Sequence, residues 1–458
     1  MIYQLIRELV RLTAYVFYRR IEVVGLENIP AEGATIFYGN HPNSLLDPAL
    51  ITAFGERKLH FMAKEALFSK PMLSLILKQM GAVPIKRRQD QSHGELNNES
   101  SFEALYTILR GGGAMGIFPE GISHDGAQLA ELKTGAARIA IEMAHQGVRV
   151  RLVPCGLTYL TRDRFRSSVL IQFGAPIIVD ENTHQTEPRT MTKEMEQHLR
   201  ALTVNGESWE ELTLLDTVRR LYQPPKISLE QRVALSQRFN QYYPEIRDLP
   251  NISQLAQDIQ EYQERLFLLG FRDREINSSL RARDLILRFF RHLTLTIIWL
   301  PFALIGSPIH FPLAFMLGKS SRVIAPRKDV IGTTKFIAGF LLLNTLYLGL
   351  GWWAWLIGWE EYALLVPLVF ALSGYGCLKI AERGRALVKT LWIWAHCFTA
   401  QETIKSLRKQ RRELKDRVHQ AVDQYLPAEV DRMFYQDRSA HTHAEPDEGE
   451  RDAEATQL

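Results

Sequence analysis

Apolar residues in the first part of the chain recur in two different patterns. Short apolar runs typical of buried strands occupy residues 34–38, 114–118, 150–154 and 169–173. Between these runs, residues 102–109 and 129–144 carry apolar positions at helical spacing. Because buried strands alternate with helices, the pattern predicts an α/β domain over residues 21–184, built on a largely buried sheet.

The first 20 residues have apolar positions at helical spacing, interrupted by arginines. This pattern predicts an amphipathic helix over residues 1–20, lying either on a membrane surface or against the body of the protein. The arginines, and the lack of a small-residue cleavage site after them, argue against a signal peptide.

The pattern changes twice after the α/β domain. Residues 185–290 are charged and helix-periodic, which predicts a helical extension. Residues 291–396 form a membrane region with apolar segments at about 292–317, 335–358 and 361–381. The last two are long enough to cross roughly 30 Å of hydrocarbon. The first contains three prolines and has basic residues on both flanks, so we expect a broken, re-entrant segment; a buried soluble helical core is the alternative.

The charges around the last two apolar segments orient them. The short connection Trp359-Glu360-Glu361 carries no Lys or Arg, whereas basic residues lie at the other ends of both segments. The excess of Lys and Arg on cytoplasmic loops then predicts a hairpin that places the α/β domain on the cytoplasmic face. Residues 397–437 should form a C-terminal helical segment, and the acidic tail 438–458 should be disordered.

Composition narrows the function classes. The net charge of +4 is small, and no basic run with interleaved aromatics suggests a nucleic-acid partner. The 3 cysteines lie far apart, which argues against a disulfide framework or a zinc site and fits a reducing compartment. We expect no metal or prosthetic group.

A candidate base and its carboxylate follow the first apolar run, in the sequence Asn40-His41-Pro42-Asn43-Ser44-Leu45-Leu46-Asp47. A hydroxyl that attacks a thioester needs a base, and a carboxylate that fixes the imidazole tautomer. Six positions along a regular helix place His41 and Asp47 on different sides of it, so they meet only if Pro42 to Ser44 form a turn. A capping or core arrangement is the alternative reading of this motif.

Three further segments add candidate binding residues. A strand-like run from Gly81 delivers the cations Lys86, Arg87 and Arg88, which either bind phosphate or form a solvated basic edge. The run Phe118-Pro119-Glu120-Gly121 ends another strand, with Lys133 on the helix that follows. Glu120 could bind a glycerol hydroxyl or hold the loop, and Gly121 permits close approach of the backbone to a ligand. Residues 152–159 line an acyl channel or form a core strand.

These four segments, in this order, resemble the four sequence blocks of the glycerolipid acyltransferase family, over roughly residues 20–180. Two departures from the usual blocks are clear. The family's first block is Asn-His-x4-Asp, whereas here five residues separate His41 from Asp47, which gives His-x5-Asp. Its third block reads Phe-Pro-Glu-Gly-Thr-Arg-Ser, whereas Ser123 stands here in place of the Arg, so no phosphate role is carried over to that position.

Both departures are similar to the fungal glycerol-3-phosphate/dihydroxyacetone-phosphate acyltransferases, whose third block is Phe-Pro-Glu-Gly-x-Ser-His-Asp. The resemblance implies acyl transfer from acyl-CoA or acyl carrier protein to glycerol 3-phosphate. It implies His41 as general base with Asp47 as its partner, Arg87 on the acceptor phosphate with Lys86 as a lesser candidate, and Glu120 with Gly121 holding the acceptor.

Other functions stay open at this stage. Lysophosphatidic acid is an alternative acceptor that would enter from the bilayer, and the family pattern does not separate it from glycerol 3-phosphate. A catalytically inactive membrane scaffold is a second alternative. A hydrolase ranks lowest, because the chain lacks a Gly-x-Ser-x-Gly elbow.

Overall fold

The computed structural model describes residues 2–69, 71–86, 98–183, 185–224, 226–277, 282–325 and 327–427. It divides into two compact units, which are described separately. The first unit comprises Met1–Leu212, Ser228–Asn240 and Ile324–Ile337, and the second comprises the remaining stretches. The first unit is therefore built from three separate parts of the chain.

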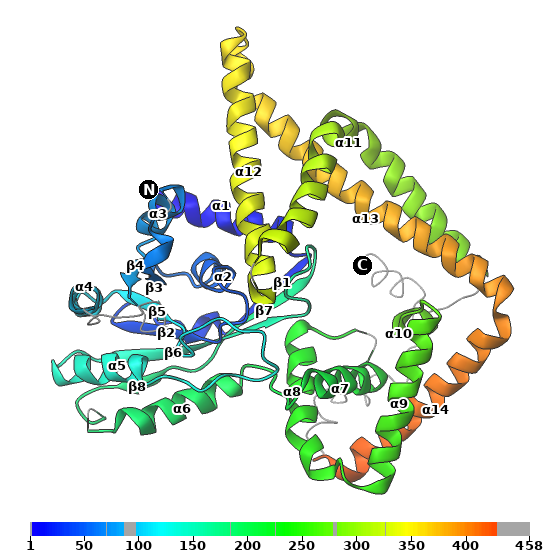
Figure 1. The fold of residues 1–458 in the computed structure, drawn as a ribbon, viewed down its shortest axis with the longest axis horizontal. Helices are drawn as coiled ribbons and strands as arrows, with labels where there is room; N and C mark the ends of the chain where they lie inside the picture. Colours follow the sequence, from blue (N-terminus) through cyan, green and yellow to red (C-terminus); the bar gives the residue numbers. More distant parts are fainter. Residues whose placement is uncertain are drawn as a thin grey trace, which may run out of the picture. The chain divides into compact units, whose positions relative to one another are not determined.

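The first unit is organised around a single sheet (Figure 1). Its strands are β1 Arg20–Val24, β2 Thr35–Gly39, β3 Leu59–Lys64, β4 Val83–Ile85, β5 Ala114–Ile117, β6 Val150–Tyr159, β7 Ser168–Phe173 and β8 Ile177–Val179. They are hydrogen-bonded in the order β1-β7-β6-β2-β5-β3-β4, with β8 paired to β6. The pairs β6–β2, β2–β5, β5–β3, β3–β4 and β1–β7 are parallel, whereas β7 and β8 are antiparallel to β6.

Helices cover both faces of this sheet (Figure 1). They are α1 Ile2–Phe17, α2 Leu46–Phe54, α3 Pro71–Gln79, α4 Glu99–Arg110, α5 Gly135–His145 and α6 Pro188–Arg200. Alternate residues of β2 enter different cores: Ile36 and Tyr38 pack with residues of α4, α5 and α6, whereas Phe37 packs with residues of α1 and α2. The sheet is thus buried on both sides, as parallel strands require, and the expected α/β fold class is confirmed.

The remaining helices are long, except for α10, which has 5 residues. They are α7 Trp209–Tyr222, α8 Leu229–Ile246, α9 Pro250–Leu268, α10 Asp273–Asn277, α11 Ala282–Ile324, α12 Lys328–Leu356, α13 Leu365–Thr399 and α14 Gln401–Tyr425. Within the second unit, α14 packs against α9 and α10. A buried ion pair joins α14 to α10, since Arg411 Nε lies 2.9 Å and Nη2 3.2 Å from the two carboxylate oxygens of Asp273.

Three helices are long and apolar enough to cross a membrane: Arg283–Ile324, Lys328–Leu356 and Leu365–His396. They carry many exposed large apolar side chains, among them Phe302, Phe315 and Trp352. Such surfaces are stable in lipid rather than in water, so the chain is a membrane-associated protein.

The expected break in the first apolar segment is wrong, because α11 is one continuous helix with Pro301, Pro308 and Pro312 inside it. A proline lacks the N–H that would bond the carbonyl four residues earlier. For Pro308 that carbonyl belongs to Leu304, and it accepts a hydrogen bond from the Ser307 hydroxyl at 3.2 Å instead. Such side-chain replacement lets a membrane helix tolerate proline. The path of α11 through a bilayer stays a prediction.

Candidate active site

The candidate site lies at the carboxyl ends of three neighbouring parallel strands. His41 follows β2, Glu120 follows β5 and Tyr159 ends β6, with β2 in the middle. The Asn40 side chain fixes the start of the His41 loop, because it accepts from Leu157 N at 2.7 Å and donates to Leu157 O at 3.0 Å. Parallel α/β sheets commonly present functional loops at this edge.

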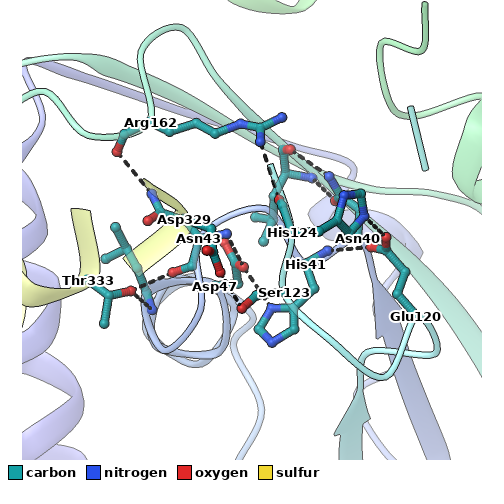
Figure 2. Close-up of polar contacts among 12 residues, drawn as sticks. Asn40, His41, Asn43, Asp47, Glu120, Ser123, His124, Arg162, Asp329 and Thr333 are labelled. Atoms are coloured by element: carbon teal, nitrogen blue, oxygen red, sulfur yellow. Dashed lines mark hydrogen bonds and ion pairs between the residues drawn. The ribbon is translucent and has the colours of Figure 1, made fainter. Parts of the chain in front are cut away.

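His41 and Asp47 meet across a tight turn, shown in Figure 2. His41 Nδ1 lies 2.8 Å from Asp47 Oδ2. The turn is closed by Leu46 N donating to Asn43 O at 3.1 Å, and Ser44 in it has a positive φ of 47°. The sequence expectation that a turn brings the two side chains together is therefore confirmed. Their catalytic roles stay a proposal.

Three hydrogen-bond donors converge on the fully buried Asp47 carboxylate. Besides His41, Asn43 N donates to Oδ2 at 2.7 Å and the Tyr159 hydroxyl donates to Oδ1 at 2.6 Å. Burial, and the charge of Asp47, raise the pKa of Tyr159 well above its usual value. Tyr159 therefore stays protonated and acts as a donor, and both Asp47 oxygens are occupied as acceptors.

The imidazole of His41 is held on its face as well as at its edge. Its ring stacks on Phe118, with centroids 4.1 Å apart and planes 8° from parallel. With Nδ1 donating to Asp47, the proton-accepting nitrogen is Nε2, which has no hydrogen-bond partner among the described residues. The His41 side chain is 12% exposed, so it is not sealed from solvent.

Glu120 holds the backbone of His41 rather than pointing away from it (Figure 2). Its Oε1 accepts from His41 N at 2.7 Å, while its Oε2 accepts from Ala130 N at 3.0 Å and from the His124 ring. His124 N in turn donates to His41 O at 3.2 Å. Both backbone polar groups of His41 are thus fixed by the loop that follows β5, which favours the loop-holding reading of Glu120.

His124 is a site residue that the sequence reasoning did not single out. Gly126 N donates to its Nδ1 at 3.0 Å, so Nε2 carries the ring proton and donates to Glu120. The hydrogen bond to Glu120 raises the pKa of His124, although burial opposes this. The signal that could have found it is its place four residues after Glu120 in the same block.

Gly121 and Lys133 lie against each other. Gly121 has a φ of +75°, and a Cβ at this position would collide with the Lys133 side chain. A larger residue is disfavoured by the positive φ, and it would also displace the Lys133 ammonium group. Lys133 is exposed, and no ion pair of its ammonium group is found within the described residues.

The basic segment after β4 is described only at its start. The backbone of Lys86 is bonded on both sides to the Asn98 side chain, at 2.9 Å each. Because β4 is parallel to the strands that carry the site, Lys86 follows the same edge of the sheet. Arg87 and Arg88 lie outside the described residues, so the structure does not place the expected phosphate ligand.

Residues of α12 complete this site from far along the chain. Thr333 and Asp329 contact the loops that carry Asn43 and Ser123 (Figure 2). Arg327, just before α12, also bonds the Ser123 hydroxyl, at 3.0 Å. All of them belong to the first unit. Nothing local in the sequence distinguishes Thr333 from other helical threonines, so sequence reasoning could not find it.

Two family models and several known proteins match the sequence of this chain. The family model for acyltransferases matches residues 20–158, and the model for the C-terminal domain of glycerol-3-phosphate acyltransferase 2 matches residues 214–430. The chain is 26% identical to glycerol-3-phosphate O-acyltransferase 2 of Saccharomyces cerevisiae, over 68% of this chain and 44% of the yeast protein. It is also 26% identical to glycerol-3-phosphate O-acyltransferase 1 of the same yeast, over 80% of this chain and 51% of that protein.

A third relative matches a shorter region. The chloroplastic 1-acyl-sn-glycerol-3-phosphate acyltransferase LPAT1 of Arabidopsis thaliana is 27% identical over 32% of this chain and 39% of its own length. The chain spans about half the length of the two yeast relatives. The chain therefore has an acyltransferase domain followed by a region that matches the C-terminal domain of glycerol-3-phosphate acyltransferase 2, and along most of its length it is similar to the fungal-type glycerol-3-phosphate acyltransferases.

Proposed function

We propose that this protein transfers a fatty acyl group from a thioester carrier to the primary hydroxyl of glycerol 3-phosphate, as a step of phospholipid synthesis. The observation that carries the proposal is the buried Asp47 carboxylate bonded to His41 Nδ1, which leaves Nε2 as the base. A hydroxyl is a weak nucleophile at neutral pH, so a positioned base is the group this reaction needs most.

In the proposed reaction, His41 Nε2 removes the hydroxyl proton while the hydroxyl oxygen forms a bond to the thioester carbonyl carbon. Asp47 stabilises the imidazolium that results. The carbon–sulfur bond then breaks, and the thiolate leaving group takes the proton from His41. The reaction balances without a metal or prosthetic group, and the acyl group does not become bonded to the protein. The carrier is acyl-CoA or acyl carrier protein.

Cations of the basic segment after β4, together with Lys133, suit the phosphate of the acceptor. We propose Arg87 as its main ligand, with Lys86 beside it in sequence and Lys133 next to Gly121 as a further positive charge. Arginine binds phosphate oxygens in bidentate fashion, and lysine contributes a point charge. In this arrangement Glu120 acts on the acceptor through the loop that it holds, because its oxygens already accept three hydrogen bonds.

We favour glycerol 3-phosphate over lysophosphatidic acid as the proposed acceptor because the glycerol-3-phosphate acyltransferases match a larger share of this chain. The yeast glycerol-3-phosphate O-acyltransferases match 68% and 80% of this chain, whereas the Arabidopsis lysophosphatidate enzyme matches 32%. Lysophosphatidic acid is the second candidate acceptor. We also propose that the α/β domain faces the cytoplasm, since Lys and Arg cluster at the ends of the α12–α13 hairpin and not at its Glu360-Glu361 connection.

The test is acyl transfer from radiolabelled acyl-CoA by purified membranes that receive either acceptor. We expect transfer to glycerol 3-phosphate, a loss of at least about a hundredfold in His41→Ala, and no loss in the control His145→Ala, an exposed histidine at the end of α5. Preference for lysophosphatidic acid would keep the mechanism and overturn the acceptor. Unchanged transfer by His41→Ala would overturn the mechanism, and no transfer to either acceptor would favour a scaffold.

A further inference from the structure

The first turns of α12 brace the turn that joins His41 to Asp47. The buried Thr333 hydroxyl accepts a hydrogen bond from Leu46 N at 3.1 Å and donates one to Asn43 O at 2.5 Å (Figure 2). These are the two backbone groups that close the turn, and Asn43 N is itself bonded to Asp47. One side chain of α12 therefore touches both ends of the segment that sets the position of Asp47.

Gly332 allows α12 to approach this turn closely. A Cβ at Gly332 would lie 2.6 Å from Arg162 O and 2.7 Å from Asn43 Oδ1, distances that real Cβ atoms do not adopt. Both neighbours are held, because the Asn43 side chain donates to Arg162 O at 3.0 Å. Any larger residue would push α12 away from the turn. By contrast, a Cβ at Gly339, two turns further along the same helix, meets no atom.

The same turns of α12 reach two more loops of the site. The buried carboxylate of Asp329 accepts from the Ser123 hydroxyl at 2.6 Å, in the loop that carries Glu120 and His124. Lys335 Nζ donates to Asp163 O at 2.5 Å, in the loop that follows β6. Residues 328–337 thus contact the loops after all three strands that build the site.

We propose that the α12 residues Asp329, Thr333 and Lys335, which contact these loops, are a working part of the active site and that Thr333 is a positioning residue for the His41–Asp47 pair. This inference rests on the proposed function for its kinetic consequence, but its structural part is independent of it. Thr333 touches neither substrate nor the reacting atoms. It acts through Asn43 and Leu46, and it keeps Asp47 where it can bond Nδ1 of His41.

The expected effect follows from the geometry of proton transfer. A displacement of about 1 Å in a catalytic group can cost about a hundredfold in rate. Valine has the shape of threonine but lacks the hydroxyl, so Thr333→Val removes the brace without opening a cavity. Binding of the acceptor phosphate by other residues is unaffected, so the loss should fall on kcat and not on KM.

The kinetic test compares three variants under the assay conditions of the wild type. We expect Thr333→Val to lower kcat by about 10- to 100-fold with KM for glycerol 3-phosphate unchanged, and Thr333→Ser, which keeps the hydroxyl, to restore most of it. The control is Thr334→Val, because the Thr334 hydroxyl bonds only Val330 O within its own helix, at 2.9 Å. Wild-type kcat in Thr333→Val, or failure of Thr333→Ser to restore kcat, would overturn the proposal.

Hydrogen exchange supplies a readout that needs no activity. In Thr333→Val and Gly332→Ala, amide exchange should accelerate in the segment 41–48 while the strands β5 and β6 keep their protection; Gly339→Ala and Thr334→Val should leave both unchanged. Unchanged exchange in segment 41–48 of Thr333→Val would overturn the brace. If the wild type transfers no acyl group, the proposed function fails, and the exchange measurement still decides whether α12 positions the turn.

Discussion

At the scale of single residues, Asp47 is the group that orients the His41 side chain, because its carboxylate accepts the hydrogen bond from Nδ1. Its two oxygens accept from a ring, a backbone amide and a phenol. A second buried phenol, that of Tyr18, lies nearby, with ring centroids of Tyr18 and Tyr159 6.1 Å apart. The Tyr18 hydroxyl has no hydrogen-bond partner among the described residues, whereas the Tyr159 hydroxyl bonds Asp47. Removing each hydroxyl in turn therefore isolates the effect of that hydrogen bond.

We expect Tyr159→Phe to lower both stability and kcat. It leaves Asp47 Oδ1 without its donor in a buried site, which costs about 1–3 kcal/mol, and it frees Asp47 to rotate away from His41. Tyr18→Phe removes a hydroxyl that has no partner and should be neutral or slightly stabilising. The measurement is thermal unfolding in detergent together with kcat for each variant. Equal losses of stability and kcat in the two variants would show that the hydrogen bond from Tyr159 to Asp47 contributes to neither.

The sequence was informative about this site only where the signal is local. His41 and Asp47 lie six positions apart, and Pro42 between them pointed to the turn that joins them. Tyr159 and Thr333 reach the same site from 112 and 287–290 positions away. Their residue types are common in strands and helices, and no pattern in a single sequence indicates which ones converge. Arg87 stays a prediction because the structure does not describe it.

At the scale of elements, periodicity predicted the sheet well because buried parallel strands appear as uninterrupted apolar runs. The expected runs at 34–38, 114–118, 150–154 and 169–173 correspond to β2, β5, β6 and β7. Proline was a poorer guide in α11, since Ser307 replaces one of the hydrogen bonds that the prolines remove. The contacts of α14 with α9 and α10 could not be predicted, because the apolar positions of each helix show that one face is buried but not which helix covers it.

The buried Arg411–Asp273 pair is expected to secure α14 to α10. Arg411→Met leaves Asp273 buried with only the Tyr262 hydroxyl as a donor, and such an uncompensated charge costs about 3–5 kcal/mol. Lys409→Met is the control on the same helix, because the Lys409–Glu413 pair is exposed and should contribute nothing measurable. Limited proteolysis of α14 in detergent measures the difference. Equal cleavage of both variants would contradict this role.

At the scale of the whole chain, the packing of α14 restricts how the apolar helices cross a membrane. α10 precedes all three of them and α14 follows them, and these two helices are joined by the Arg411–Asp273 pair. We therefore expect both ends of the apolar region to lie on one side, with an even number of crossings between them. Because α12 and α13 are joined by a short acidic connection and have basic flanks, we expect these two helices to cross and α11 not to cross.

Cysteine labelling in sealed vesicles tests this topology. In a chain whose native cysteines are replaced, cysteine at Arg283, Lys319 or Arg412 should react with a membrane-impermeant maleimide from one side only. Cysteine at Glu360, in the connection between α12 and α13, should react only from the other side. If cysteines at Arg283 and Lys319 reacted from opposite sides, α11 would cross the membrane, and the expected even number of crossings by α12 and α13 alone would be wrong.

The three-part construction of the first unit also determines when the protein can become active during its synthesis. The stretches Met1–Leu212 and Ser228–Asn240 leave the ribosome first, whereas Ile324–Ile337 follows only after α11 has been made. Domains generally fold as units while the chain emerges from its amino end. The first unit is therefore complete only after α11 has been made, so we expect the proposed acyl transfer to begin only once the nascent chain carries an apolar helix that can enter lipid.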